Sequence, residues 1–220
     1  MAEVQYQADS SKIIITGIDE KPIKIPSQLY PLAGTIHYIN YENTENFSEN
    51  DPLTVKIKEV YDSIQPGIGT CYSNTEKLID ALQAKGIKAT PFVGWLFAGA
   101  TLPVHHCFAI IENHILDFNP NFDSFYTDEY ANIGIDAARD KLTSEMLKRR
   151  ELPNSETTCF GKASKHMLYI ASPCKPQAGL KMYQKLMKAF PKHPCYRNIN
   201  QYGLSDTQKM MFEKQGHKFD

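Results

Sequence analysis

Apolar residues recur at helical spacing in two neighbouring segments of the chain. The first segment follows Pro52, which suits a first helical turn, and carries Leu53, Ile57, Val60, Tyr61 and Ile64. The second ends at Gly86, which suits a left-handed C-cap, and carries Leu78, Ile79 and Leu82. Its start offers Thr70 as one cap and a capping box of Ser73 with Glu76 as another. The pattern predicts helices over residues 52–64 and 71–86, joined by a loop with two glycines and a proline.

Short apolar runs follow these helices and are typical of strands. We expect strands over residues 87–96, 104–111 and 115–118, with a tight turn between the last two. Consecutive strands after consecutive helices indicate an α+β fold with an antiparallel sheet, not a doubly wound parallel sheet. Further strands are expected over residues 12–17 and 165–171, and further helices over residues 127–150, 177–190 and 205–216.

The last two of these three strands bring a histidine close to an acid. With a two-residue turn at Glu112 and Asn113, alternation of side chains places His106 on the same face as Asp117 and Asn119. His105 then lies on the opposite, mainly apolar face with Cys107. A three-residue turn would instead bring Asp117 to the face of His105. The two-residue turn favours His106 as a base and leaves Asp117 and Asn119 as alternative orienting groups.

Cys71 lies at the predicted start of the second helix. The free N–H groups and partial positive charge of a helix N-terminus favour a thiolate and can stabilise an oxyanion. A nucleophilic cysteine also needs a base and a group that orients the base, which His106 and Asp117 could supply. The alternative interpretation of Cys71 is a buried structural cysteine.

Four short segments resemble the transglutaminase-like group of papain-fold cysteine enzymes. They are Gly69-Thr70-Cys71, Gly86-Ile87-Lys88-Ala89, His106-Cys107-Phe108-Ala109 and Leu116-Asp117-Phe118-Asn119-Pro120. The resemblance implies one papain-like domain over residues 1–220, with N-terminal helices packed on an antiparallel sheet. Its catalytic core would span about 52–120, and a helical C-terminal extension would span about 121–220.

The function expected from these residues is that of a cysteine peptidase or amide hydrolase. Cys71, His106 and Asp117 would form a catalytic triad that works through a thioester acyl-enzyme. The alternatives are a transglutaminase or deamidase acting on protein glutamine, or a non-catalytic binding module on the same fold. In either enzyme the partner would be a protein or peptide substrate.

Three further residues are candidates near this site. Gln65 lies six positions before Cys71, the offset of the oxyanion glutamine in papain-type proteases, although it could simply end the preceding helix. The Cys71 backbone N–H is the other oxyanion donor. Trp95 and His105 are candidates for lining a substrate cleft, with the core as their alternative location.

Charge and hydropathy exclude several other classes of protein. Lys and Arg number 24 and Asp and Glu 25, so the net charge of −1 gives no reason to expect nucleic acid or an anionic membrane as partner. No apolar run approaches the roughly 18 residues that a membrane helix needs. His105, His106, Cys107 and His114 lack a carboxylate or second cysteine at ligand spacing, so we expect no metal and no cofactor.

The five cysteines are an odd number and form no CxxC pair, which argues against a disulfide framework and favours a reducing compartment. The first residues lack the basic-then-apolar pattern of a secretory signal. We therefore expect a cytoplasmic protein, with secretion or injection without a classical signal peptide as the alternative.

Overall fold

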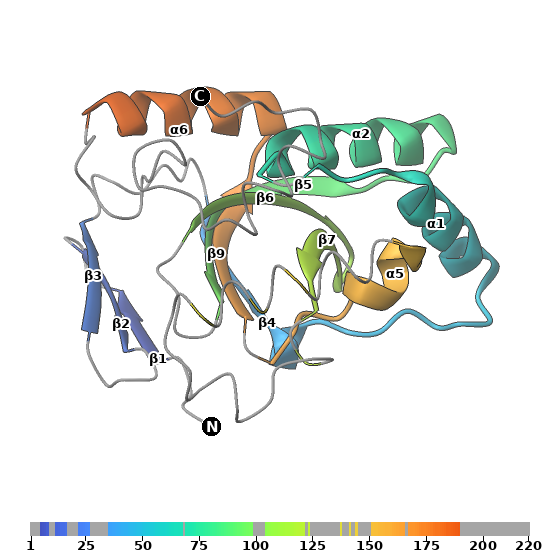
Figure 1. The fold of residues 1–220 in the computed structure, drawn as a ribbon, viewed down its shortest axis with the longest axis horizontal. Coiled ribbons are helices and arrows are strands. Elements are labelled where there is room, and N and C mark those ends of the chain that lie inside the picture. Colours follow the sequence, from blue (N-terminus) through green and yellow to red (C-terminus); the bar gives the residue numbers. More distant parts are fainter. Residues whose placement is uncertain are drawn as a thin grey trace.

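The computed structural model describes the backbone of residues 5–8, 12–16 and 22–26, the segments 35–67, 69–98, 104–121, 151–165 and 167–189, and the isolated positions 123, 137, 141 and 144. Within these residues the chain forms two antiparallel sheets and four α-helices (Figure 1). The fold is therefore α+β, as the element order predicted. The helices expected over residues 127–150 and 205–216 lie outside the described segments.

The larger sheet has six strands and curls into a half-barrel (Figure 1). Its spatial order is β4 (His37–Asn40), β9 (Met167–Pro173), β5 (Thr90–Ala98), β6 (Val104–Ile111), β7 (His114–Pro120) and β8 (Thr158–Gly161). Every neighbouring pair is antiparallel. The four strands expected between residues 87 and 171 are present, with ends shifted by up to three residues. Strands β4 and β8 were not expected.

The smaller sheet has three antiparallel strands near the start of the chain. They are β1 (Gln5–Ala8), β2 (Lys12–Thr16) and β3 (Pro22–Pro26), paired in that order. The central strand is the one expected over residues 12–17, and its two neighbours were not expected.

The four helices are α1 (Pro52–Ser63), α2 (Cys71–Ala84), α5 (Asn154–Thr157) and α6 (Pro176–Ala189), and a 3-10 turn, η2 (Tyr41–Asn43), precedes α1. Asp51 caps α1 by accepting a hydrogen bond from the Thr54 N–H, and Pro52 occupies the first turn as expected. Gly86 follows α2 with φ at +73°, which confirms the left-handed C-cap.

The capping box expected at the start of α2 is absent. Thr70 occupies the N-cap position without a side-chain cap hydrogen bond, and Ser73 is an exposed helical residue. The Asn74 side chain instead binds the preceding loop, accepting from the Gly67 N–H at 3.0 Å and donating to the Gly67 carbonyl at 2.8 Å. The contact reaches seven residues back and joins the loop to the first turn of the helix.

Both faces of the curled sheet are buried. Helices α1 and α2 cover one face, where Ile57, Tyr61, Leu78 and Leu82 pack against Ala109, Ile111 and Leu116. The inner face of the curl holds Phe92, Phe108, Ile115 and Tyr169. The apolar face expected to form the core therefore does so, and the face that carries His106 is buried as well.

Candidate active site

The turn between β6 and β7 has two residues, as expected. Ile111 pairs with His114, and the turn places Glu112 at φ 54°. This register confirms that His106 and Asp117 share a face. His106 Nε2 lies 2.8 Å from Asp117 Oδ1, and both side chains are buried. Of the two alternative orienting groups, the structure brings Asp117 to the histidine.

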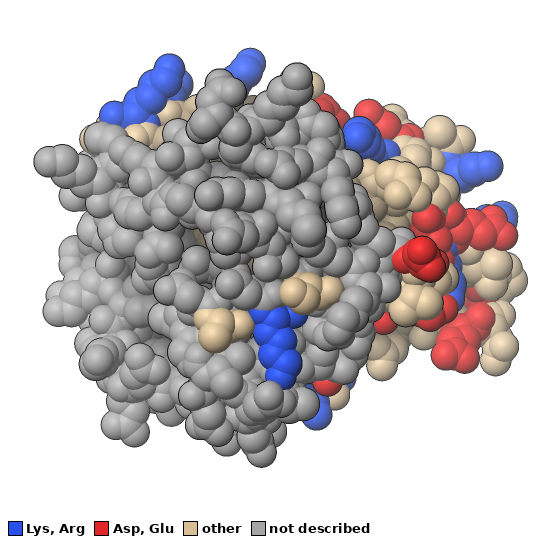
Figure 2. All heavy atoms as spheres, viewed as in Figure 1, with Lys and Arg blue, Asp and Glu red and all other residues tan. Residues whose placement is uncertain are grey.

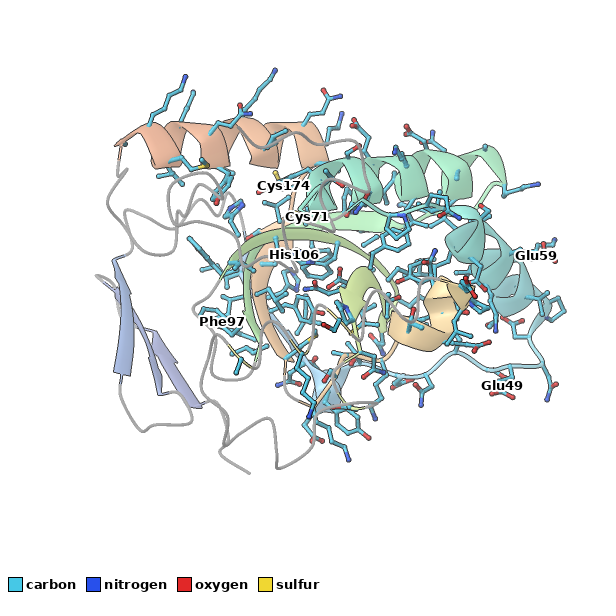
Figure 3. The ribbon with its side chains drawn as sticks, viewed as in Figure 1. Glu49, Glu59, Cys71, Phe97, His106 and Cys174 are labelled. Atoms are coloured by element: carbon cyan, nitrogen blue, oxygen red, sulfur yellow. The ribbon has the colours of Figure 1, made fainter. Side chains whose placement is uncertain are left out.

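Cys71 is the first residue of α2 and is partly exposed. Cys71 lies close enough to the His106 ring to contribute to the raised pKa of that imidazole, and the two residues are labelled near each other in Figure 3. Since Nε2 of His106 faces Asp117, Nδ1 is the ring nitrogen left for the sulfur. Cys71 at the start of a helix therefore lies near a His106–Asp117 pair held by a hairpin.

The protonation of His106 follows from its neighbours. Burial disfavours the charged imidazolium, but the charge and hydrogen bond of Asp117, aided by Cys71, outweigh burial and raise the pKa of His106 to about 10. At neutral pH the ring is therefore an imidazolium held between a sulfur and a carboxylate. An imidazolium is the form that stabilises a thiolate.

Three groups besides His106 form hydrogen bonds with Asp117. The hydroxyl of Tyr169 donates to Oδ2 at 2.8 Å, and the Asn119 backbone N–H donates to Oδ1 at 3.1 Å. The hydroxyl of Tyr61 donates to the Asp117 carbonyl at 2.8 Å. Asp117 rather than Asn119 therefore faces the histidine, and Asn119 contributes its backbone.

Tyr169 and Tyr61 were not among the residues selected from the sequence. Tyr169 lies 52 positions from its partner and Tyr61 lies 56, and each is also a large apolar residue typical of a core. The hydrophobic patterns of the strand and the helix that contain these tyrosines do not predict their hydrogen bonds to Asp117. Only the pairing of β9 with β5 and the packing of α1 on the sheet reveal it.

His105 and Trp95 lie in the core. His105 stacks on Tyr183, meets the Trp95 ring edge-on, and forms a hydrogen bond through Nδ1 with the Tyr72 hydroxyl. Burial and the charge of His106 lower the pKa of His105 to about 3, so this ring is neutral. With Trp95 1% exposed and His105 6% exposed, both side chains take the core location rather than the cleft location.

Gln65 lies exposed in the loop between α1 and α2. The described structure contains no contact between its side chain and Cys71. Its role as an oxyanion donor stays a prediction, and the N–H groups of the first turn of α2 remain the donors that the helix itself supplies.

The other cysteines of the described segments differ from Cys71. Cys107 and Cys159 are buried, and burial raises the pKa of both thiols. Cys174 is partly exposed and follows β9. Among these segments we found no group of three or more histidine, cysteine or acidic side chains that could hold a metal ion, and no helix with the length and apolar character to span a membrane.

Comparison of the chain with protein-family models, with curated proteins and with solved structures gave no match. The chemistry of the site therefore rests on its own geometry.

Proposed function

We propose that this protein is a cysteine hydrolase of amide bonds, a peptidase or amidase with a papain-like, transglutaminase-like fold. The observation that carries the proposal is the hydrogen-bonded His106–Asp117 pair beside Cys71, which begins α2. A nucleophile, its base and the group that orients the base stand in the order that thiol catalysis requires. The curled antiparallel sheet with a helix that begins at the cysteine supports the papain-like assignment.

In the first half of the proposed reaction, the Cys71 sulfur attacks the carbonyl carbon of the substrate amide. The new S–C bond turns the carbonyl oxygen into an oxyanion, which N–H groups of the first turn of α2 stabilise. The His106 imidazolium then gives its proton to the leaving nitrogen, and the C–N bond breaks. An amine departs, and a thioester to Cys71 and a neutral imidazole remain.

In the second half, a water molecule attacks the thioester carbon while His106 takes one of its protons. Cleavage of the S–C bond releases a carboxylic acid and restores the thiolate and imidazolium. Asp117 keeps the ring oriented throughout, held by Tyr169 and by the Asn119 backbone. An amine in place of water would give transamidation. We propose water because it is present at every site that solvent reaches.

Mass spectrometry of a denatured model protein tests this proposal and separates its variants. New termini would report peptide hydrolysis, a gain of about 1 Da at glutamine would report deamidation, and attachment of an added fluorescent primary amine would report transamidation. The proposal predicts hydrolysis that Cys71→Ala abolishes. It predicts a loss of about 10²–10⁴-fold with His106→Asn, the usual contribution of a general acid–base.

Cys174→Ala is the matched control, since it removes a second partly exposed cysteine that packs in the same side-chain cluster as Cys71 but forms no hydrogen bond with His106 or Asp117 in the described structure, and it is expected to leave the rate unchanged. Product formation that persists at the full rate in Cys71→Ala would exclude the proposed nucleophile.

A further inference from the structure

A second candidate site lies on the side of the molecule away from Cys71. A cleft of about 780 Å³ opens between the segment that precedes α1, the exposed side of α1, and the α5–β8 segment. In Figure 3, Glu49 and Glu59 mark this side, well separated from the labels of Cys71 and His106. The cleft therefore belongs to a different surface from the candidate active site.

The floor of the cleft is apolar and solvent-accessible. Phe47 and Phe160 lie with their ring centroids 4.8 Å apart, and both are only partly buried. Val55 on α1 is 46% exposed at the cleft wall. Leaving such side chains in contact with water is unfavourable, and burying them favours an apolar partner.

The rim of the cleft is acidic. Glu49, Glu59 and Glu156 are exposed around it, and Lys58 is the one basic residue among its described lining. The three carboxylates form no ion pair with a described residue. Figure 2 shows acidic side chains gathered on this side of the molecule. The chain as a whole has a net charge of only −1, so this negative charge is local.

The walls of the cleft are joined by specific hydrogen bonds. Asp62 of α1 accepts from the Ser155 backbone N–H at 2.8 Å and from its hydroxyl at 2.9 Å. The Asn154 side chain donates to the carbonyls of Tyr61 and Ile64 at the end of α1. The cleft is therefore preformed, which lowers the entropic cost of binding.

We infer that this cleft docks a basic segment of another polypeptide, with lysine or arginine at the acidic rim and an apolar side chain on the Phe47–Phe160 floor. The charge of the rim disfavours nucleic acid and acidic peptides. The apolar floor and the volume favour a peptide over a lone cation. Such a surface would bind a protein partner at a distance from the Cys71 site, and it does not depend on that site being catalytic.

Fluorescence anisotropy with a defined probe tests this inference. The probe is a fluorescein-labelled decapeptide that alternates lysine or arginine with leucine or phenylalanine. The protein carries Cys71→Ala, so that turnover cannot destroy the probe and failure of catalysis is kept separate from failure of docking. We expect saturable binding that weakens as salt is raised from about 50 mM to about 300 mM, because the ionic part of the contact is screened.

The triple substitution Glu49→Gln, Glu59→Gln and Glu156→Gln is expected to weaken binding about tenfold or more. Asp80→Asn is the matched control, because Asp80 is an exposed acid on α2 outside the cleft lining, and it is expected to leave the affinity within about twofold. Each substitution replaces an exposed acid with its isosteric amide, so folding is preserved.

The inference would be overturned if the peptide caused no change in anisotropy or if the triple variant bound it as tightly as the unmodified protein. It would also be overturned if a peptide with glutamate in place of the basic residues bound equally well. Equal binding of a peptide with serine in place of the apolar residues would overturn it too, because the rim would then bind positive charge alone. The protein could instead self-associate without binding the peptide. If the triple variant abolished that self-association, the cleft would be assigned to a second copy of the chain, and the docking of a basic segment would equally be refuted.

Discussion

At the scale of single residues, Asp117 is held by hydrogen bonds to both of its carboxylate oxygens. One carboxylate oxygen faces His106 and the Asn119 backbone, and the other accepts from Tyr169. A buried carboxylate with donors on both oxygens has one orientation, which it transmits to the imidazole. In the proposed mechanism Tyr169 would therefore position His106 through Asp117, since its hydroxyl is buried against the carboxylate.

The substitution Tyr169→Phe tests this role. Loss of the donor to a charged, buried oxygen is expected to lower the free energy of unfolding by about 1.5–3 kcal/mol. If the tyrosine positions the acid, kcat also falls while KM stays unchanged, because the substrate does not touch this hydroxyl. Steady-state kinetics and urea titration measure the two effects.

Tyr41→Phe is the control for the same chemical change. The Tyr41 ring lies 3.8 Å from the Lys162 ammonium, a contact that phenylalanine retains, and its hydroxyl makes no hydrogen bond within the described structure. Stability and kcat are expected to match those of the unmodified protein. A drop in stability of Tyr169→Phe with kcat unchanged would make Tyr169 merely structural.

At the scale of elements, the start of α2 presents the sulfur and depends on Asn74. The Asn74 side chain is 4% exposed and ties Gly67 to the helix through two hydrogen bonds, with the Thr70 hydroxyl donating to it at 3.1 Å. This contact fixes the loop that leads into Cys71. The geometry of the first turn therefore depends on a residue three positions into the helix.

We predict that Asn74→Ala lowers the free energy of unfolding by about 1–3 kcal/mol, because it leaves the loop amide without its partner. The rate at which iodoacetamide alkylates Cys71, followed by peptide mass spectrometry, is also expected to change in Asn74→Ala, since the sulfur loses its fixed position beside His106.

The neighbouring substitution Ser73→Ala separates the two accounts of this helix start. A capping box would make Ser73→Ala cost about 1 kcal/mol. The exposed position of Ser73 predicts a change within about 0.5 kcal/mol. Equal losses for Ser73→Ala and Asn74→Ala would contradict the contact with Gly67.

At the scale of the whole molecule, local patterns predicted more than distant pairings. The spacing in α1 and α2 and the two-residue turn depend on neighbours in sequence, so the face shared by His106 and Asp117 could be predicted. The insertion of β9 between β4 and β5 joins segments far apart in the chain. It brings Tyr169 to Asp117, and nothing in the local sequence of β9 specifies that contact.

The buried His106–Asp117 pair also predicts how stability depends on pH. The pKa of His106 is raised to about 10 in the folded protein, against about 6.5 in an unfolded chain. A group whose pKa is raised by folding contributes its full stabilisation of the folded protein at pH values below its pKa in the unfolded chain. That contribution is lost as pH rises through its pKa in the folded protein. The stabilisation is therefore complete below about pH 6.5 and lost towards about pH 10.

Urea titrations of the unmodified protein and of His106→Gln measure this dependence. The stability difference between the two is expected to be largest near pH 6.5 and to shrink at alkaline pH. Titrating groups that do not interact with His106 cancel in the comparison. A difference that is constant across this range would mean that His106 does not carry a proton in the folded protein.

The proposed mechanism requires Cys71 and His106 to act as a reactive pair, and the rate of Cys71 alkylation at low pH measures this pairing. An unpaired thiol is about half ionised near pH 8.5, so its alkylation slows steeply below that pH. We predict that at about pH 6 Cys71 of the unmodified protein reacts with iodoacetamide about tenfold or more faster than Cys71 of His106→Gln, because a protonated His106 favours a thiolate beside it. Equal rates of Cys71 alkylation in the two proteins would contradict the proposed Cys71–His106 pair and leave the binding-module alternative.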